Sequence, residues 1–176
     1  MPVPVDPAIV VTRRWPRSVE ESLCATYRNA TLRDPDEPLG DEGLRQALAS
    51  SDVLLPCVAD QLSAEMLLAP DVRTRFIGNF GVGFSNIDTD AAREAGIVVT
   101  NTPGVLTDAT ADLAMTLVLM TARRAGEGER HLRDRAWTGW RPIHMMGGDV
   151  TGRTLGVLGM GRIGRALFRG RRESSR

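Results

Sequence analysis

The chain has 176 residues, of which 42% are hydrophobic and 25% charged, and its 22 basic residues balance its 22 acidic ones. This is the composition of a globular protein, and no apolar run approaches the roughly 20 residues that cross a bilayer. Residues 1–6 carry neither the basic nor the long apolar segment of a secretory signal. We therefore expect a soluble, cytoplasmic protein without a membrane partner.

Strand and helix patterns alternate along residues 8–100, as a doubly wound parallel sheet requires. We predict strands at 8–12, 29–32, 53–56, 74–77 and 97–100, helices at 18–26, 41–50, 63–68 and 88–95, and a loop at 34–41. Five strands in about 100 residues are enough for a self-contained α/β domain. Cys24 and Cys57 are isolated and have small or apolar neighbours, which predicts buried thiols and neither a disulfide nor a metal pair.

A glycine-rich loop at 77–88 follows a predicted strand and precedes a predicted helix, where open α/β sheets place their ligands. Gly81 and Gly83 would let successive backbone N–H groups converge on one point, which suits a carboxylate or a phosphate. A plain turn in which Asn86 or Asp88 caps the next helix fits the loop equally well, and the loop alone does not decide between them.

Pro103 and Gly104 end the fifth strand, and a helix follows that Thr107 or Asp108 could cap. Its apolar residues lie on two different faces: Ala111, Ala114, Met115, Val118 and Ala122 on one, and Leu113, Leu117 and Met120 on the other. A helix that is apolar all round needs protein on most sides, so we predict a buried helix wedged between two domains.

The run Gly159-Met160-Gly161-Arg162-Ile163-Gly164 is a G-x-G-x-x-G fingerprint. The apolar residues 155–158 before it predict a buried strand, and Ile163, Ala166 and Leu167 after it have helical spacing. Gly159 would allow a sharp turn, Gly161 a close approach to a pyrophosphate, and Gly164 tight packing of helix on strand. This context favours dinucleotide binding over a purely structural turn.

The residue that binds the adenosine ribose, and so distinguishes NAD from NADP, usually follows such a fingerprint by about 20 residues. In this sequence that position falls at or beyond Arg176. The sequence therefore does not distinguish NAD from NADP. Six arginines and a single acid, Glu173, lie in residues 162–176. We interpret Glu173 as a solvated charge. Because residues 169–176 have no interleaved aromatic residues and lose their apolar periodicity, we favour a disordered or aberrant end over a nucleic-acid site.

Four segments in order resemble the D-isomer-specific 2-hydroxyacid dehydrogenases, and the glyoxylate and hydroxypyruvate reductases among them most closely. They are residues 79–88, 95–104, 106–113 and 159–164, and residues 136–142 also fit the reductase pattern. The resemblance implies a flavodoxin-like substrate-binding domain over residues 1–101. It implies that residues 102–176 begin a Rossmann domain for NAD or NADP, with the interdomain helix and the first strand, turn and helix.

The same resemblance implies roles for particular residues. The backbone at Val82 and Gly83 would hold the substrate carboxylate, and Thr107 would contact the cofactor. Arg162 and Ile163 would lie against the pyrophosphate, in a cofactor-binding turn made of Gly159, Met160, Gly161, Arg162, Ile163 and Gly164. Trp137 and Trp140 would lie in an arm that packs on a second subunit of a homodimer, although ordinary packing explains Trp137 equally well.

The implied reaction is hydride transfer between the nicotinamide and C2 of a small 2-oxo or 2-hydroxy acid, such as glyoxylate or hydroxypyruvate. In the family, the arginine, acid and histidine that catalyse this reaction follow the first helix of the nucleotide domain. In this sequence those positions would lie beyond residue 176. We interpret His131 and His144 as structural or exposed, and we expect a truncated or frame-shifted product that binds cofactor weakly and does not turn over. The alternative is a non-catalytic, corepressor-like interaction protein that retains the dehydrogenase fold.

Overall fold

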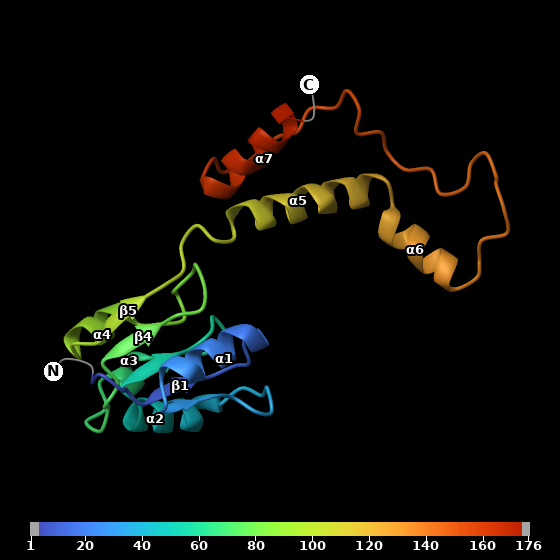
Figure 1. Ribbon diagram of the computed structural model, residues 1–176. Helices are drawn as coiled ribbons and strands as arrows, with labels where there is room; N and C mark the ends of the chain where they lie inside the picture. The colour runs from blue at the N-terminus through green and yellow to red at the C-terminus, as the bar shows by residue number, and fades with distance from the viewer. Residues whose placement is uncertain (1–3, 174–176) are drawn as a thin grey trace. The chain divides into compact units, whose positions relative to one another are not determined.

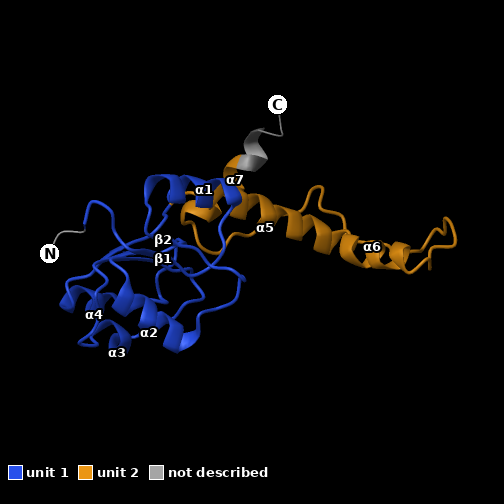
Figure 2. Ribbon diagram, turned by 60° about the horizontal axis from the view of Figure 1, so that its bottom comes forward, with its two compact units in different colours: residues 1–103 blue, residues 104–176 orange. Residues whose placement is uncertain are grey.

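The computed structural model describes residues 4–173, and the chain divides into two compact units, residues 1–103 and 104–176 (Figure 2). Unit 1 holds a five-stranded sheet with the order β2-β1-β3-β4-β5. Every pair of neighbouring strands in this sheet is parallel. This is the flavodoxin-type order, so the predicted α/β class is confirmed.

The elements of unit 1 fall within two residues of the predicted ones. The strands are β1 (Ile9–Val11), β2 (Ala30–Thr31), β3 (Val53–Leu55), β4 (Phe76–Gly78) and β5 (Val98–Thr100). The helices are α1 (Arg17–Thr26), α2 (Gly40–Ser50), α3 (Ala64–Leu67) and α4 (Thr89–Glu94). Helix α3 contacts both α2 and α4 on one face of the sheet, and α1 lies on the other face (Figure 2). This division follows from right-handed crossovers that run in both directions from β1.

The hydrophobic core lies under α2, α3 and α4. Along β1, Ile9 and Val11 are buried while Val10 between them is only half-buried, as the alternation of a strand requires. Val10 is the residue of β1 that packs against this core, in register with Leu54 and Ile77, which are fully buried. Ile9 and Val11 lie on the opposite face of the sheet. From the helices, Leu48, Met66, Leu67 and Ala92 close the same core. This packing fixes β3 and β4, whose carboxyl ends carry the loops described below.

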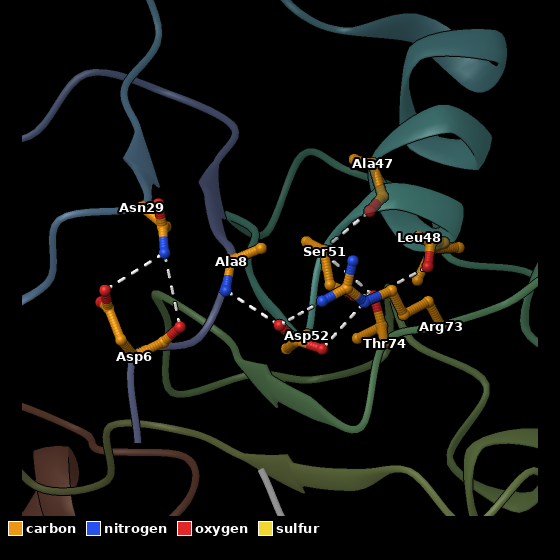
Figure 3. Close-up of polar contacts among 9 residues, drawn as sticks. All are labelled: Asp6, Ala8, Asn29, Ala47, Leu48, Ser51, Asp52, Arg73 and Thr74. Carbon is orange, nitrogen blue, oxygen red and sulfur yellow. Dashed lines mark hydrogen bonds and ion pairs between the residues drawn. The ribbon is translucent and has the colours of Figure 1, made fainter. Parts of the chain in front are cut away.

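A polar cluster ties the strands together at their amino ends (Figure 3). The Asp52 carboxylate accepts hydrogen bonds from the Ala8 backbone N–H at 2.9 Å and from the Arg73 guanidinium at 2.8 and 2.9 Å. These donors hold the pKa of Asp52 below its usual value, the Ala8 N–H most strongly. Beside them the buried Thr74 hydroxyl donates to the Leu48 carbonyl at 3.0 Å. The starts of β1, β3 and β4 are thereby joined at the edge opposite the candidate site.

Unit 2 contains α5 (Thr107–Ala122), α6 (Ala125–Arg133) and α7 (Arg162–Glu173) (Figure 1). Helix α5 contacts both α6 and α7. The predicted strand at 155–158 is wrong, since these residues are irregular and Leu158 is fully exposed. A parallel strand needs a neighbour to take its hydrogen bonds, and the described part of unit 2 contains no other strand.

Two predictions about α5 are also wrong. Ala111 is its only buried residue, while Leu113 and Leu117 are more than half exposed, because unit 2 packs few side chains against the helix. Thr107 and Asp108 lie inside the helix and do not cap it. The N-cap is Leu106, whose carbonyl accepts the Thr110 hydroxyl at 2.7 Å. None of the helices in the described residues has the length and apolar character needed to cross a membrane.

One further expectation needs correction. Cys24 is exposed on α1, a helix that buries only Glu20, and Cys57 is half-buried, so neither is a core thiol. Helix α7 extends as far as Glu173 and so includes the start of the basic segment from Arg169. Residues 174–176 of the predicted disordered end lie outside the described residues.

Candidate functional site

The loop between β4 and α4 forms the centre of the candidate site. Its carbonyl groups at Gly81, Val82 and Gly83 are each held by a donor from unit 1. The Thr102 N–H donates to the Gly81 oxygen at 3.0 Å, and the Asn101 and Asn79 side chains donate to the Val82 and Gly83 oxygens at 2.8 Å each. The N–H groups of Val82, Gly83 and Phe84 donate no hydrogen bond within the described residues. These donors are available to a ligand.

Both alternatives left open for this loop find a physical basis. Asp88 is the N-cap of α4 and accepts the Ala91 N–H at 2.9 Å, so the loop does end in a capped helix. Asn86 does not cap the helix. Its buried amide instead donates to the carbonyls of Cys57 and Asp60 and to Asn79 Oδ1. Capping therefore explains Asp88 but leaves the free N–H groups at residues 82–84 unexplained.

A buried carboxylate supports the loop from the neighbouring strand ends. Asp60 Oδ2 accepts the Thr12 hydroxyl at 2.5 Å and the Cys57 N–H at 2.8 Å. Thr12 follows β1 and Cys57 follows β3, the two strands between which the strand order reverses. Open α/β sheets bind ligands at this switch point, outside the carboxyl ends of the strands. Asp60 thus lies at the switch point, and the loop after β4 lies at the same carboxyl edge of the sheet.

The surroundings of the loop are partly aromatic and partly charged. The Trp15 and Phe80 rings lie 5.7 Å apart, and Phe80 is about half exposed. Arg13 offers a cation at the same edge, but its guanidinium binds both carboxylate oxygens of Asp36 at 2.8 and 3.2 Å. That bond lowers the pKa of Asp36 to about 2, with help from the Arg14 N–H. Because the Arg13 guanidinium is already bound to Asp36, the donors that the loop offers to a ligand are its backbone N–H groups.

The glycine turn of unit 2 has the geometry that its fingerprint predicts. Gly159 has a φ of +97°, which side chains rarely adopt. A Cβ on Gly164 would lie 2.1 Å from the Gly159 oxygen, whereas a Cβ on Gly161 would meet nothing within 4 Å. Helix α7 begins at Arg162, so its first free N–H groups follow the turn directly. The turn therefore packs tightly against its helix at Gly164, whereas the space beside Gly161 is free.

The residues predicted to contact the cofactor or a second subunit also lie in unit 2. Thr107 is the first residue of α5, the helix that contacts α7, while Met160, Arg162 and Ile163 are exposed around the glycine turn. Val82 and Gly83 belong to unit 1. Trp137 and Trp140 line a hollow of about 340 Å³ in unit 2 and are themselves largely exposed.

The two histidines line the same hollow. The rings of His131 and His144 lie 4.8 Å apart, and each has a buried Nε2 without a hydrogen-bond partner in the described residues. Burial, with the nearby Arg141, lowers the pKa of His144. The two rings thus pair with one another within unit 2, and no histidine lies in unit 1.

The sequence motifs contained the supporting residues without revealing their roles. Asn79, Asn86 and Asn101 all lie in the segments that carry the family resemblance, but only contacts between strand ends far apart in sequence show what their amides bind. Asp60 and Thr12 lie outside those segments. Polar residues directly after the strands were the available signal, because carboxyl ends of parallel strands share one edge.

The fold and the loop together define a doubly wound α/β protein with free N–H donors at the carboxyl edge of its sheet. The family model for the D-isomer specific 2-hydroxyacid dehydrogenase, catalytic domain, matches residues 9–167. The chain belongs to this family.

Known relatives agree with this assignment. The glyoxylate reductase of Aeropyrum pernix is 40% identical over 163 residues, which are 90% of this chain and 48% of the relative. A Polaromonas sp. JS6 66 structure assigned to the NAD-binding D-isomer specific 2-hydroxyacid dehydrogenases has a TM-score of 0.86 at 35% identity, covering 98% of this chain and 53% of the other. The chain spans about half the length of the curated relatives it matches.

One solved relative carries bound molecules. The NADPH-dependent glyoxylate/hydroxypyruvate reductase of Sinorhizobium meliloti, in complex with NADP and malonate, has a TM-score of 0.74 at 29% identity. The match covers 97% of this chain and 51% of that structure.

Proposed function

We propose that this chain supplies the acid-binding part, and the beginning of the nucleotide-binding part, of an NAD- or NADP-dependent oxidoreductase. Its substrate is a small 2-oxo or 2-hydroxy acid such as glyoxylate or hydroxypyruvate. Residues 1–101 are the substrate-binding domain in this proposal, and residues 102–176 begin the nucleotide-binding domain. The reductases from Aeropyrum pernix and Sinorhizobium meliloti support this choice of substrate class.

The observation that carries the proposal is the row of free N–H groups at Val82, Gly83 and Phe84. Hydrogen bonds from backbone N–H groups to an ionised carboxylate are among the stronger ones in proteins. Val82 and Gly83 bind the carboxylate oxygens in the proposed site. Because the donors are on the main chain, they fix the carboxylate without a neutralising side chain, and the adjacent C2 atom remains free to face a reaction partner.

The residues of unit 2 fit a dinucleotide. The space beside Gly161 is where a pyrophosphate can approach the backbone, and Gly164 keeps the helix against the turn. The N–H groups at the start of α7 favour an anion there, while Gly159, Met160, Arg162 and Ile163 surround it. Thr107, at the start of α5, contacts the cofactor in this proposal. The bound nicotinamide supplies or accepts the hydride.

The proton and the polarising charge for the reaction must come from side chains that face C2. Both histidines lie in unit 2, paired with one another beside Trp140. Neither residue is assigned a catalytic role in this proposal. The two unpaired cysteines fit a reducing compartment, in line with a cytoplasmic location.

We further propose that the functional form is a homodimer, joined through unit 2. Leu113, Leu117 and Leu119 of α5 and Trp140 are exposed, and a monomer rarely leaves so many apolar groups in water. The same exposed helix favours the second candidate function, a non-catalytic interaction protein of the same fold. Ligand binding at residues 82–84 separates the two, since an interaction protein has no need of it.

The proposal is tested by titrating the ¹⁵N-labelled chain with glycolate, a small 2-hydroxy acid, and separately with NADH. We expect millimolar glycolate to shift the amide resonances of Val82, Gly83 and Phe84, and NADH to shift those of Gly161 and Arg162. Unchanged amide resonances at residues 82–84 would overturn the assignment of the acid site. Shifts spread evenly over exposed residues would mean non-specific binding and contradict it as well.

A further inference from the structure

We propose that Asn79 and Asn101 are positioning residues that aim the N–H groups of the 81–84 loop at the substrate carboxylate. The inference rests on the proposed function, because it assigns a role to two side chains whose amide nitrogens are engaged by the loop itself. Each residue acts through one peptide group. Asn101 acts on the peptide between Val82 and Gly83, and Asn79 on the peptide between Gly83 and Phe84.

The geometry of the peptide bond makes each hydrogen bond directional. In a trans peptide the carbonyl of one residue and the N–H of the next point in opposite directions. The peptide bonds of this loop are trans. Asn101 draws the Val82 oxygen toward the protein, so the Gly83 N–H points away from it. Asn79 does the same to the Gly83 oxygen, so the Phe84 N–H also points outward.

A glycine-containing loop needs this support. Gly83 is exposed, and a Cβ built on it would meet nothing within 4 Å, so no neighbouring group crowds its α-carbon. Glycine peptides reorient at little steric cost. Without the two amides, the free N–H groups would sample several directions, and a carboxylate would have to order them on binding.

The amide of Asn79 is itself fixed. The residue is 1% exposed, and its Oδ1 accepts the Asn86 side chain at 3.2 Å. The Gly83 oxygen can only accept a hydrogen bond, so Asn79 must present its NH₂ group to the loop. Asn86 is anchored in turn on the carbonyls of Cys57 and Asp60. The chain of contacts thus runs from the end of β3 to the Phe84 N–H.

The two asparagines hold the loop from different strands. Asn79 follows β4, and Asn101 follows β5. Their effects on the loop are therefore separable by mutation. Replacing Asn101 with alanine releases the Gly83 N–H, whereas replacing Asn79 with alanine releases the Phe84 N–H.

The test compares N101A and N79A with the wild-type chain in glycolate titrations followed by ¹⁵N–¹H spectra. We expect each variant to bind glycolate about fivefold to tenfold more weakly, the loss typical of one misdirected hydrogen bond. The glycolate-induced shift should fall selectively at Gly83 in N101A and at Phe84 in N79A. Such a residue-specific pattern is not expected from a general loss of stability.

The control is T74V, which removes the buried Thr74 hydroxyl at the opposite end of β4. It should lower stability while leaving glycolate affinity unchanged. If wild type binds glycolate and both variants bind it equally well with unchanged shift patterns, the positioning role is wrong and the proposed function stands. If wild type does not bind, the proposed function itself fails. Should N79A not fold, N101A at the half-buried position decides the outcome.

Discussion

Gly164 lies so close to Gly159 that a Cβ added to Gly164 would be 2.1 Å from the Gly159 carbonyl oxygen. Backbone atoms cannot move aside as a flexible side chain can, so the first turn of α7 and the glycine turn must be built together. We expect Gly164→Ala to open the turn and weaken NADH binding at least about tenfold. Fluorescence titration with NADH measures this loss.

The matched control for Gly164→Ala is Gly156→Ala, because a Cβ at Gly156 would meet nothing within 4 Å and its φ is not positive. This variant should bind NADH like the wild-type chain. Equal NADH affinities for the two variants would show that the contact between Gly164 and Gly159 does not support the cofactor site.

Gly81 makes a comparable close approach in unit 1, but to a side chain. A Cβ on Gly81 would lie 2.2 Å from Cγ1 of Val58. We expect Gly81→Ala to displace the loop, lowering both glycolate affinity and thermal stability. Adding Val58→Ala removes the clashing methyl group, so the double variant should regain most of both losses. Thermal unfolding and glycolate titration of the two single variants and the double variant form the cycle.

One outcome of this mutant cycle would contradict the proposed clash between Gly81 and Val58. Additive losses in the double variant would mean that the two side chains do not compete for the same space. Gly83→Ala provides a second comparison, because open space surrounds that position and the fold should tolerate the substitution.

Asp52 supports the amino edge of the sheet, so Asp52→Asn should lower the free energy of unfolding by about 1.5–3 kcal/mol, the range for hydrogen bonds to a charged group. The pKa of Asp52 is lowered in the folded state from its usual value of 3.8. Its stabilising contribution is therefore complete above that value and disappears as the pH falls through the lower, folded pKa. The difference between wild type and variant should shrink in acid.

Urea unfolding at several pH values measures this difference. Asp71→Asn is the control, because Asp71 is an exposed residue just before Arg73 and should change stability little at any pH. A stability difference between wild type and Asp52→Asn that stayed constant down to pH values below 3.8 would contradict the assigned role.

The exposed apolar side of α5 predicts association. Leu117 is 54% exposed, and placing a charge there should prevent a second copy from covering the helix. We expect Leu117→Lys to shift the chain from dimer to monomer in sedimentation velocity. Leu68→Lys makes the same exchange at a 44% exposed leucine of unit 1 and should leave the dimer intact. A wild-type chain that sediments as a monomer would contradict the proposed homodimer.

Local patterns predicted unit 1 well because its elements obey local rules. Alternating burial along Ile9–Val11 and the Asp88 cap of α4 are both encoded within a few residues. Two predictions that depend on partners distant in sequence failed in unit 2. Residues 155–158 have the composition of a strand but no strand beside them, and the apolar faces of α5 have little protein to pack against.

In the candidate site, too, local patterns were predicted and contacts between residues distant in sequence were not. Glycine spacing, which reports backbone needs directly, predicts the cofactor role of the turn at 159–164. The roles of Val82 and Gly83 come from the family resemblance, because the loop alone fits a plain turn equally well. The asparagines that orient the loop were not recognised as such, because Asn101 meets Val82 across 19 residues and Asn86 meets Cys57 across 29. An asparagine has the same appearance in sequence whether it caps a helix or supports a ligand loop.

The polar cluster around Asp52, Arg73 and Thr74 has a consequence for how this family can diversify. It joins the strands at their amino ends, while every group assigned to acid binding follows a carboxyl end. Mutations that reshape the loops for a larger or differently charged acid therefore leave the interactions that hold the sheet untouched. A substitution that changes specificity therefore costs stability only through the contacts of the loop itself, as at Gly81.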